Sequence, residues 1–353
     1  MLGDLDIEAL AVTTKALRRR RGVRNARSLL RLALARGPGG MSLRETAAWA
    51  HLARVAELTD ASLNDRLHQS CEFLEAIAMA MLRAKAPGSD FRWPGRSLRI
   101  SDGTCVSKPG SKGTDWRVHA VYDLGAGGFS HFELTDKHGG EALDRGAAIA
   151  GEIRLGDRNY STAQGFRRFK ASVGEDANAD YVARLRWSSL RLSTPEGEKF
   201  DLVAHMRNMK KADKQIDDLN VLIEGAGEPM PTRLVIRRKP EEAARVERER
   251  LERLARKKGK TLDERSLLAA EFVVLATSLP AETFPAEEVL AMYRLRWQIE
   301  LAFKRLKSLL NLDRLPARTE KGARSWIWAH LILAIAIDEH SQDFLESSPS
   351  GHA

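Results

Sequence analysis

The order of strand-like and helix-like segments between residues 98 and 187 restricts the fold of this chain more than any other feature. Three segments rich in β-branched and aromatic residues are joined by glycine-rich turns, which predicts three consecutive strands at 98–104, 116–124 and 129–136. Four further segments are expected to alternate between helix and strand, at 141–150, 153–160, 161–173 and 180–187. This β-β-β-α-β-α-β order predicts a mixed α/β domain.

The first 90 residues have no strand-like segment and predict an all-helical region. Residues 18–36 are basic and amphipathic, and a glycine-rich stretch at 37–40 interrupts the helical pattern. Ser42 and Glu45 have the spacing of a capping box, and Thr59 precedes a second apolar-periodic run. Such short helices fit a plain helical domain and a small DNA-binding bundle equally well.

The α/β rhythm stops between residues 188 and 270, which predicts an inserted subdomain. Strand-like pieces at 199–206 and 232–238 are followed by a highly charged segment at 240–260. The charged segment is expected to be a solvated helix with ion pairs between residues four apart. A strand at 271–280 then resumes the core, and Pro285 opens the next helix.

These boundaries divide the chain into four parts. They are a helical N-terminal domain (1–90), a core formed by 96–187 with 271–340, the insertion (188–270) and a flexible tail (341–353). Residues 87–95 are expected to be a linker. Residues 325–337 are apolar but too few to span a bilayer, which predicts a buried last helix.

Composition narrows the partners and the compartment. The net charge of +9 favours a polyanionic partner such as nucleic acid, although many cytosolic proteins reach this value without one. The two cysteines, Cys71 and Cys105, lack C-x-x-C spacing, which argues against a disulfide framework or zinc site. Acidic residues near the N-terminus are unlike a secretory signal. We therefore expect a cytoplasmic protein that is not embedded in a membrane.

A basic helix near the C-terminus holds one glutamate in an unexpected place. At about 100° per residue, one stripe roughly 60° wide would contain four side chains: Tyr293, Arg296, Glu300 and Lys307. An apolar stripe beside it must face the core and comprises Leu295, Ile299, Ala302, Phe303, Leu306 and Leu310. Glu300 would then point into a cleft among cations. The alternative is an amphipathic helix with an ion-paired polar edge.

Two aspartates end candidate strands, Asp102 in the first and Asp157 in the fourth. Either residue alone could be an ordinary turn residue or helix cap. Together with Glu300, however, they provide three carboxylates that can converge at one edge of a sheet. Mg²⁺ is usually held by a few carboxylates together with substrate phosphate, so this set is suited to hard divalent cations.

The motifs around these acids resemble those of a known family. The Y-x2-R-x3-E-x6-K pattern of residues 293–307 is similar to the signature of DDE transposases from bacterial insertion sequences. The D-G-T at 102–104 and the D-R-N-Y at 157–160 resemble the other two acidic motifs of that family. Asn159 stands where glycine is commoner, and asparagine tolerates left-handed backbone better than most residues. The resemblance covers about residues 98–315.

The resemblance implies a ribonuclease H-like core with Asp102 on the first strand, Asp157 on the fourth and Glu300 on the helix after a β-rich insertion. It implies that these three residues are catalytic and hold two Mg²⁺ or Mn²⁺ ions. The implied activity is cleavage of double-stranded DNA at insertion-sequence ends, followed by joining of the 3′-OH ends to target DNA. A homodimer assembled on DNA is also implied, with residues 1–90 binding the ends.

Five further residues are candidates for DNA contact. Arg296 and Lys307 can hold phosphate, Tyr293 can donate to phosphate or stack on a base, and Arg158 follows the second aspartate. Phe272 stands where relatives often carry a tryptophan that receives a flipped base, but its strand context favours a place in the core. Two other functions remain open: a different metal-dependent nuclease on the same core, and a non-catalytic DNA-binding protein derived from a transposase.

Overall fold

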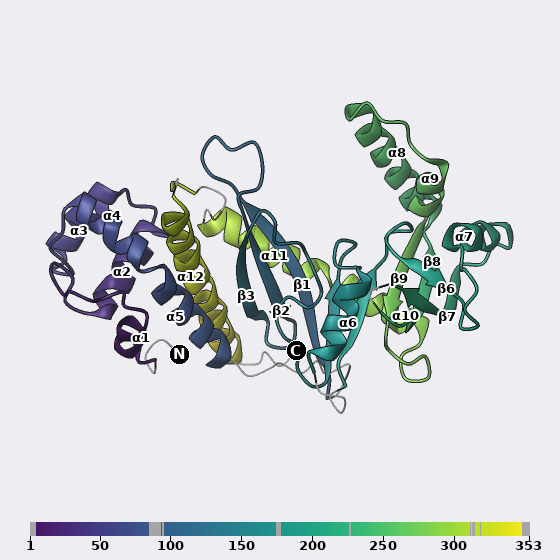
Figure 1. Cartoon of the computed structure of the whole chain (residues 1–353), viewed down its shortest axis with the longest axis horizontal. Coiled ribbons are helices and arrows are strands. Elements are labelled where there is room, and N and C mark those ends of the chain that lie inside the picture. Colours follow the sequence, from purple (N-terminus) through teal and green to yellow (C-terminus); the bar gives the residue numbers. More distant parts are fainter. Residues whose placement is uncertain are drawn as a thin grey trace. The chain divides into compact units, whose positions relative to one another are not determined.

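The computed structural model describes residues 5–84, 93, 95–173, 178–225, 227–310, 312, 315–317 and 319–347 (Figure 1). The side chains of 305, 306, 308–310 and 339–347 are outside this description. The chain divides into two compact units. Unit 1 comprises Met1–Gly88, Gly103–Gly140 and Ile299–Ala353, and unit 2 comprises Ser89–Asp102 and Glu141–Gln298.

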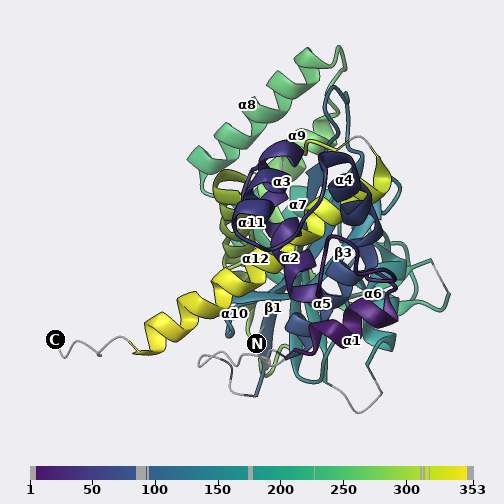
Figure 2. The same ribbon diagram turned by 90° about the vertical axis from the view of Figure 1, so that its left-hand side faces the viewer.

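Helices dominate unit 1. They are α1 (Ile7–Thr13), α2 (Ala26–Arg36), α3 (Leu43–Leu52), α4 (Asp60–Gln69), α5 (Cys71–Ala84) and α12 (Glu320–Ser347), with most of α11 (Trp297–Leu310). The long helix α12 packs along α5 and also contacts α2 and α4 (Figure 1, Figure 2). Its residues from Trp326 to Ile335 are mostly buried, which confirms the prediction of a buried last helix.

The predicted helix starts in unit 1 are confirmed by their capping contacts. The Ser42 hydroxyl accepts a hydrogen bond from the Glu45 N–H at 3.2 Å, and the Glu45 carboxylate accepts one from the Ser42 N–H at 2.7 Å. These reciprocal bonds satisfy two N–H groups that the first turn of α3 leaves without helical partners. Thr59 caps α4 by accepting from the Ser62 N–H at 3.2 Å.

The strands of unit 1 form one antiparallel hairpin beside the end of a third strand. They are β2 (Trp116–Asp123) and β3 (Gly128–Asp136), in the order β3-β2-β1, and the last residues of β1 (Ser97–Val106) belong to this unit. Helices α5 and α12 pack against β3.

Unit 2 contains a mixed sheet in the order β1-β4-β5-β9-β8-β7-β6. Its strands after β1 are β4 (Glu152–Gly156), β5 (Asp180–Arg184), β6 (Arg191–Ser193), β7 (Ile216–Glu224), β8 (Met230–Arg238) and β9 (Phe272–Thr277). Strands β1, β4 and β5 are parallel, and helix α6 (Ala163–Ala171) makes the crossover that a parallel pair requires. Every residue of β4 is buried, as expected for a central parallel strand.

The predicted helix at 141–150 is wrong, because a buried arginine organises this segment as a loop. Arg154 is 0% exposed and forms an ion pair with Glu152. Its guanidinium also donates to the carbonyl oxygens of Leu143 at 3.3 Å and Arg145 at 3.1 Å. A buried charge needs such partners, and the loop supplies carbonyls that a helix would have used internally.

The insertion contains more helix than predicted. Residues 199–206 were expected to be a strand, but helix α7 (Leu202–Lys211) begins there. The Asp201 carboxylate caps it by accepting from the N–H groups of Val203 and Ala204, each at 2.9 Å. Strand β8 and the charged helix α8 (Glu241–Lys257) confirm the other two predictions, and α9 (Glu264–Ala270) follows.

The single helix predicted for residues 293–307 is interrupted. Helix α10 (Ala286–Arg294) ends after Tyr293, residues 295–296 form a turn, and α11 begins at Trp297. The Arg296 N–H donates to the Tyr293 carbonyl at 3.2 Å, a bond over three residues instead of four. The continuous stripe from Tyr293 to Lys307 is therefore wrong, although Ile299, Ala302 and Phe303 are buried as expected.

Some predictions concern residues at the limits of the description. Most of the expected linker at 87–95 lies outside the described residues, and so do residues 348–353 of the expected tail. Helix α12 extends through the first part of that tail to Ser347. Within the described ranges, none of the helices combines the length and apolarity needed to cross a membrane.

Candidate active site

The two predicted aspartates lie at the same edge of the unit 2 sheet. In the parallel pair β1–β4, the last paired residues are Ile100 and Leu155. Asp102 and Asp157 each follow two residues later, so continuing this register places them opposite one another. Neighbouring strands lie about 4.8 Å apart, which is close enough for two carboxylates to share one ligand. Both aspartates are half-buried.

Asp157 begins a tight turn immediately after β4. Its Oδ1 accepts a hydrogen bond from the Asn159 N–H at 2.7 Å, as in an Asx-turn. Among the described non-glycine residues, positive φ occurs only at Lys15, Arg54 and Asp213, so Asn159 does not adopt the left-handed conformation. The asparagine is therefore accommodated without backbone strain.

Arg184 is a member of this edge that the sequence interpretation missed. In the parallel pair β4–β5, Gly156 is opposite Ala183, so the next position places Arg184 opposite Asp157. Its side chain is half-buried, and its pKa is lowered first by burial and then by the positive charge of Arg158. The basic end of the strand predicted at 180–187 was the available signal. The sequence alone does not show which of Arg184 and Arg186 lies beside Asp157, and the strand register identifies Arg184.

Tyr293 and Arg296 from the end of α10 belong to the same cluster. The Arg296 guanidinium carbon lies 6.0 Å from the centroid of the Tyr293 ring. Burial raises the pKa of the Tyr293 hydroxyl, the charges of Arg296 and Arg184 oppose this shift, and Asp157 adds to it. Within unit 2, Tyr293 therefore contacts Arg296 and feels the charges of Arg184 and Asp157.

Further cations surround the carboxyl end of β4. The Arg158 guanidinium is 3.7 Å from the Glu247 carboxylate on α8. Lys239, after β8, has its pKa lowered to about 8, first by burial and then by Arg184. Its ammonium donates to the Ala270 carbonyl at 2.6 Å. Like charges are therefore concentrated here with Glu247 as a counter-ion, an arrangement suited to anionic ligands.

The other predicted residues lie away from this cluster in the sequence, on α11 and at the start of β9. Glu300 lies exposed in the first turn of α11, after the insertion, and Lys307 lies in its last turn. Both belong to unit 1. Across the described part of the chain, no group of three or more His, Cys, Asp or Glu side chains is gathered closely enough to hold a metal ion. Phe272 is 2% exposed and belongs to the hydrophobic core of unit 2, which favours the core interpretation.

The donor set at this edge fits a hard cation and a phosphate group. Asp102 and Asp157 supply the oxygen ligands that Mg²⁺ prefers, and two carboxylates with substrate phosphate are a common arrangement. Arg184 and Arg296 can donate to phosphate oxygens through their fork-shaped guanidinium groups. Fold and donor set together describe a mixed α/β protein whose parallel strands β1, β4 and β5 end at an edge that carries two acids and an arginine.

Comparisons with known proteins identify the family. The sequence profile of the family described as "Transposase DDE domain" matches residues 93–336. The chain is 42% identical over 347 residues to InsL, the protein assigned as transposase of the insertion sequence element IS186A in Escherichia coli K12; the match covers 98% of this chain and 92% of that protein. It is also 42% identical over 348 residues to the transposase of IS421 from Escherichia coli, with the same coverage. This chain therefore belongs to the DDE transposase family of bacterial insertion sequences.

A solved structure is also similar to the chain. It is a cryo-EM structure of the piggyBac transposase synaptic complex with hairpin DNA. The identity is 9% and the TM-score 0.47, and the match covers 99% of this chain and 68% of that one.

Proposed function

We propose that the protein cleaves double-stranded DNA at the ends of its insertion sequence and joins the 3′-OH ends to target DNA. The acidic residues of this reaction are Asp102, Asp157 and Glu300. The observation that carries the proposal is the strand register, which puts two acids of separate family motifs opposite each other. Family membership supports the same activity over other metal-dependent nucleases.

Asp102 and Asp157 would hold Mg²⁺ or Mn²⁺, and Glu300 would complete the ligand set. When bound, such ions would supply Lewis-acid chemistry, which activates a water nucleophile and stabilises a leaving oxygen. Because Asp157 accepts the Asn159 N–H in its turn, one of its oxygens is already oriented by the backbone. The turn thereby fixes the direction of the other carboxylate oxygen, so less side-chain entropy would be lost when that oxygen binds an ion.

The cations of unit 2 position the phosphodiester. Arg184, adjacent to Asp157, and Arg296, beside Tyr293, bind the non-bridging oxygens and stabilise the charge that develops on them. Burial raises the pKa of the Tyr293 hydroxyl, and this hydroxyl donates a hydrogen bond to the phosphate. Lys307 and Arg158 contribute positive charge along the DNA path.

The strand order supports a ribonuclease H-like core. β3-β2-β1 is antiparallel at its β2–β3 pair, and β1-β4-β5 is parallel. Asp102 lies on the first strand and Glu300 on the helix after the insertion, as the family resemblance implies, whereas Asp157 directly follows the fourth strand instead of lying on it. We retain the four-part domain division, the two ions and the homodimer on DNA as parts of this proposal.

Substitution of each acid tests the proposed function. Asp102→Ala, Asp157→Ala and Glu300→Ala should each reduce Mg²⁺-dependent end cleavage by more than about 10³-fold, or about 4 kcal/mol in the barrier. End binding measured without metal should stay nearly intact. Cleavage of radiolabelled duplexes carrying the element's terminal repeat measures both.

A matched control uses another aspartate that ends a strand. The Asp136 carboxylate accepts from the His138 N–H at 2.8 Å, the same turn contact that Asp157 makes. Asp136→Ala should therefore reproduce the loss of the turn bond while leaving cleavage near the wild-type rate. If Asp102→Ala or Asp157→Ala cleaved as fast as Asp136→Ala, that aspartate would not be catalytic.

A further inference from the structure

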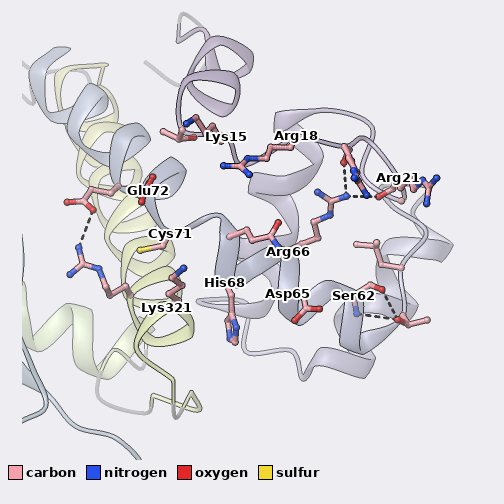
Figure 3. Close-up of a pocket in the computed structure, with 18 of the residues that line it drawn as sticks. Lys15, Arg18, Arg21, Ser62, Asp65, Arg66, His68, Cys71, Glu72 and Lys321 are labelled. Atoms are coloured by element: carbon pink, nitrogen blue, oxygen red, sulfur yellow. Dashed lines mark hydrogen bonds and ion pairs between the residues drawn. The ribbon is translucent and has the colours of Figure 1, made fainter.

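A basic loop in unit 1 is unused by the proposed catalytic chemistry. We define it as residues 15–22, between α1 and α2, with four consecutive arginines from Arg18 to Arg21. It borders a pocket of about 1380 Å³, which α4, α5 and the start of α12 also line. Figure 3 shows Lys15, Arg18 and Arg21 along one side of this pocket, and Glu72 and Lys321 on the side of α5 and α12.

Contacts at both ends and in the middle hold the basic loop in place. Ala16 and Val23 are buried, and Val23 pairs with Ala56 in an isolated β-bridge. The Arg66 guanidinium on α4 donates to the carbonyl oxygens of Arg19 at 2.6 Å and Arg21 at 3.2 Å (Figure 3). These bonds use the backbone of the loop and leave its arginine side chains exposed.

Gly22 fixes the end of the basic loop. Its φ is +74°, a conformation that favours glycine, and its carbonyl accepts from the Glu57 N–H at 2.9 Å. A Cβ at this position would lie 2.6 Å from the Glu57 carbonyl oxygen, so a side chain would displace the loop. The loop is therefore a defined structure and not a free basic tail.

Three of the four arginines are available to an external anion. Arg20 lies 3.8 Å from the Glu8 carboxylate. Within the described residues, Arg18, Arg19 and Arg21 are exposed and make no ion pair. The opposite wall carries Glu72, Glu75 and Glu320, and of these Glu75 pairs with Arg324 at 3.3 Å. An anion is attracted to the loop, whereas the opposite wall mixes these acids with Lys321 and Arg324.

We propose that the basic loop binds the phosphate backbone of double-stranded DNA through Arg18, Arg19 and Arg21. This inference rests on the proposed function, because a DNA substrate makes duplex phosphate the relevant polyanion. Phosphate contacts position a duplex without reading its sequence. Because Arg66 orders the loop before binding, less conformational entropy is lost when the arginines engage the DNA.

Salt dependence of binding tests the loop directly. The triple variant Arg18→Gln, Arg19→Gln, Arg21→Gln should reduce the slope of log K against log salt by about 2 to 3. At about 100 mM salt, duplex affinity should fall between roughly 100-fold and 1,000-fold. Fluorescence anisotropy of a labelled terminal-repeat duplex, in EDTA and with the full-length chain, measures both quantities.

The matched control removes the same charge elsewhere. The variant Arg245→Gln, Arg253→Gln, Arg256→Gln on the exposed face of α8 lowers the net charge equally. It should leave the slope unchanged. A wild-type slope in the loop variant would overturn the proposal, and so would an equal loss in both variants, because the effect would then follow net charge alone.

Arg66→Gln separates the support of the loop from its charge. Loss of the two bonds to the loop carbonyls should weaken duplex binding several-fold, with a slope change of no more than about 1. Wild-type affinity in this variant would overturn the role of Arg66. Because binding is measured without metal, these results do not depend on cleavage. Failure of the catalytic proposal would instead appear as normal cleavage by the aspartate variants.

Discussion

At the scale of single residues, Arg184 adds a half-buried positive charge beside the acid Asp157. It follows Ala183 at the end of β5 and stands opposite Asp157 when the register is continued. Desolvation lowers its pKa because burial disfavours the charged form. A guanidinium still remains protonated near neutral pH, so a partly desolvated cation lies ready beside the acid.

Arg184 variants should therefore separate geometry from charge. Arg184→Lys keeps the charge but loses the two-pronged donor, and we expect cleavage to fall at least about tenfold. Arg184→Gln should lose about 10²- to 10³-fold, comparable to removal of one transition-state donor. Arg191→Gln, at the exposed first residue of β6, is the control and should cleave normally. Single-turnover rates at saturating DNA measure the effect, and a wild-type rate for Arg184→Lys would exclude a forked contact.

Burial of the charged Lys239 side chain lowers the stability of the folded protein, and this effect depends on pH. Its pKa falls from 10.5 to about 8 in the folded protein, so the unfolded chain binds more protons between these values. Stability from this group consequently rises as the pH increases from about 8 towards 10.5, and the full penalty is present below about 8. Burial and the neighbouring arginine Arg184 are the leading causes.

Replacing Lys239 should remove this pH dependence. We expect Lys239→Met to raise the melting temperature relative to wild type at pH 7, with a difference that shrinks between pH 8 and pH 10.5. Lys211→Met, on the exposed end of α7, is the control and should show no such trend. Melting curves across this pH range measure the difference. A constant difference at every pH would show that the ammonium is not destabilised.

At the scale of elements, strands and helix caps were easier to predict from the sequence than the interruption between α10 and α11. The three strands after residue 97 and the capping box at Ser42 were predicted from local composition, because each depends on nearby residues. The turn at 295–296 was not, since the sequence there has no glycine or proline and its helical periodicity is continuous.

Long-range contacts explain the other errors of element assignment. The loop at 141–150 depends on Arg154, a residue on a strand that follows it in sequence, and no local pattern shows where that guanidinium is buried. The sequence does contain a start signal for α7, because Asp201 precedes an amphipathic run. The strand-like composition of residues 199–206 nevertheless favours a strand. Arg184 required a register that only pairing reveals.

At the scale of the whole molecule, the net charge of +9 does not show where positive charge is concentrated along the described residues. In unit 1 it lies on the basic loop, and in unit 2 it lies around the end of β4. Arg158 and Arg296 in the family motifs already indicated the positive charge around the end of β4. The basic loop could be seen as a run of arginines, but its fixed conformation depends on Arg66 from another helix.

The two compact units cut across the predicted domains. Unit 1 combines the helical N-terminal region with β2, β3 and α12, and the boundary crosses β1 between Asp102 and Gly103. A division by sequence order cannot show this, because the segments of each unit are far apart along the chain. The assignment of functions to residues 1–90 and 188–270 stays a prediction.

The central claim is that Asp102 and Asp157 stand opposite each other at one sheet edge, and cysteine cross-linking tests it most directly. In the Asp102→Cys, Asp157→Cys variant, exposed Cys105 is replaced by serine to prevent mispairing. Neighbouring strands place paired Cα atoms within the roughly 4.4–6.8 Å range of disulfides. We expect mild oxidation to form an intramolecular disulfide, measured by thiol titration and mass spectrometry. The Asp102→Cys, Leu155→Cys pair, offset by two residues along β4, should form far less. Equal or no cross-linking in the two pairs would contradict the register on which the catalytic proposal depends.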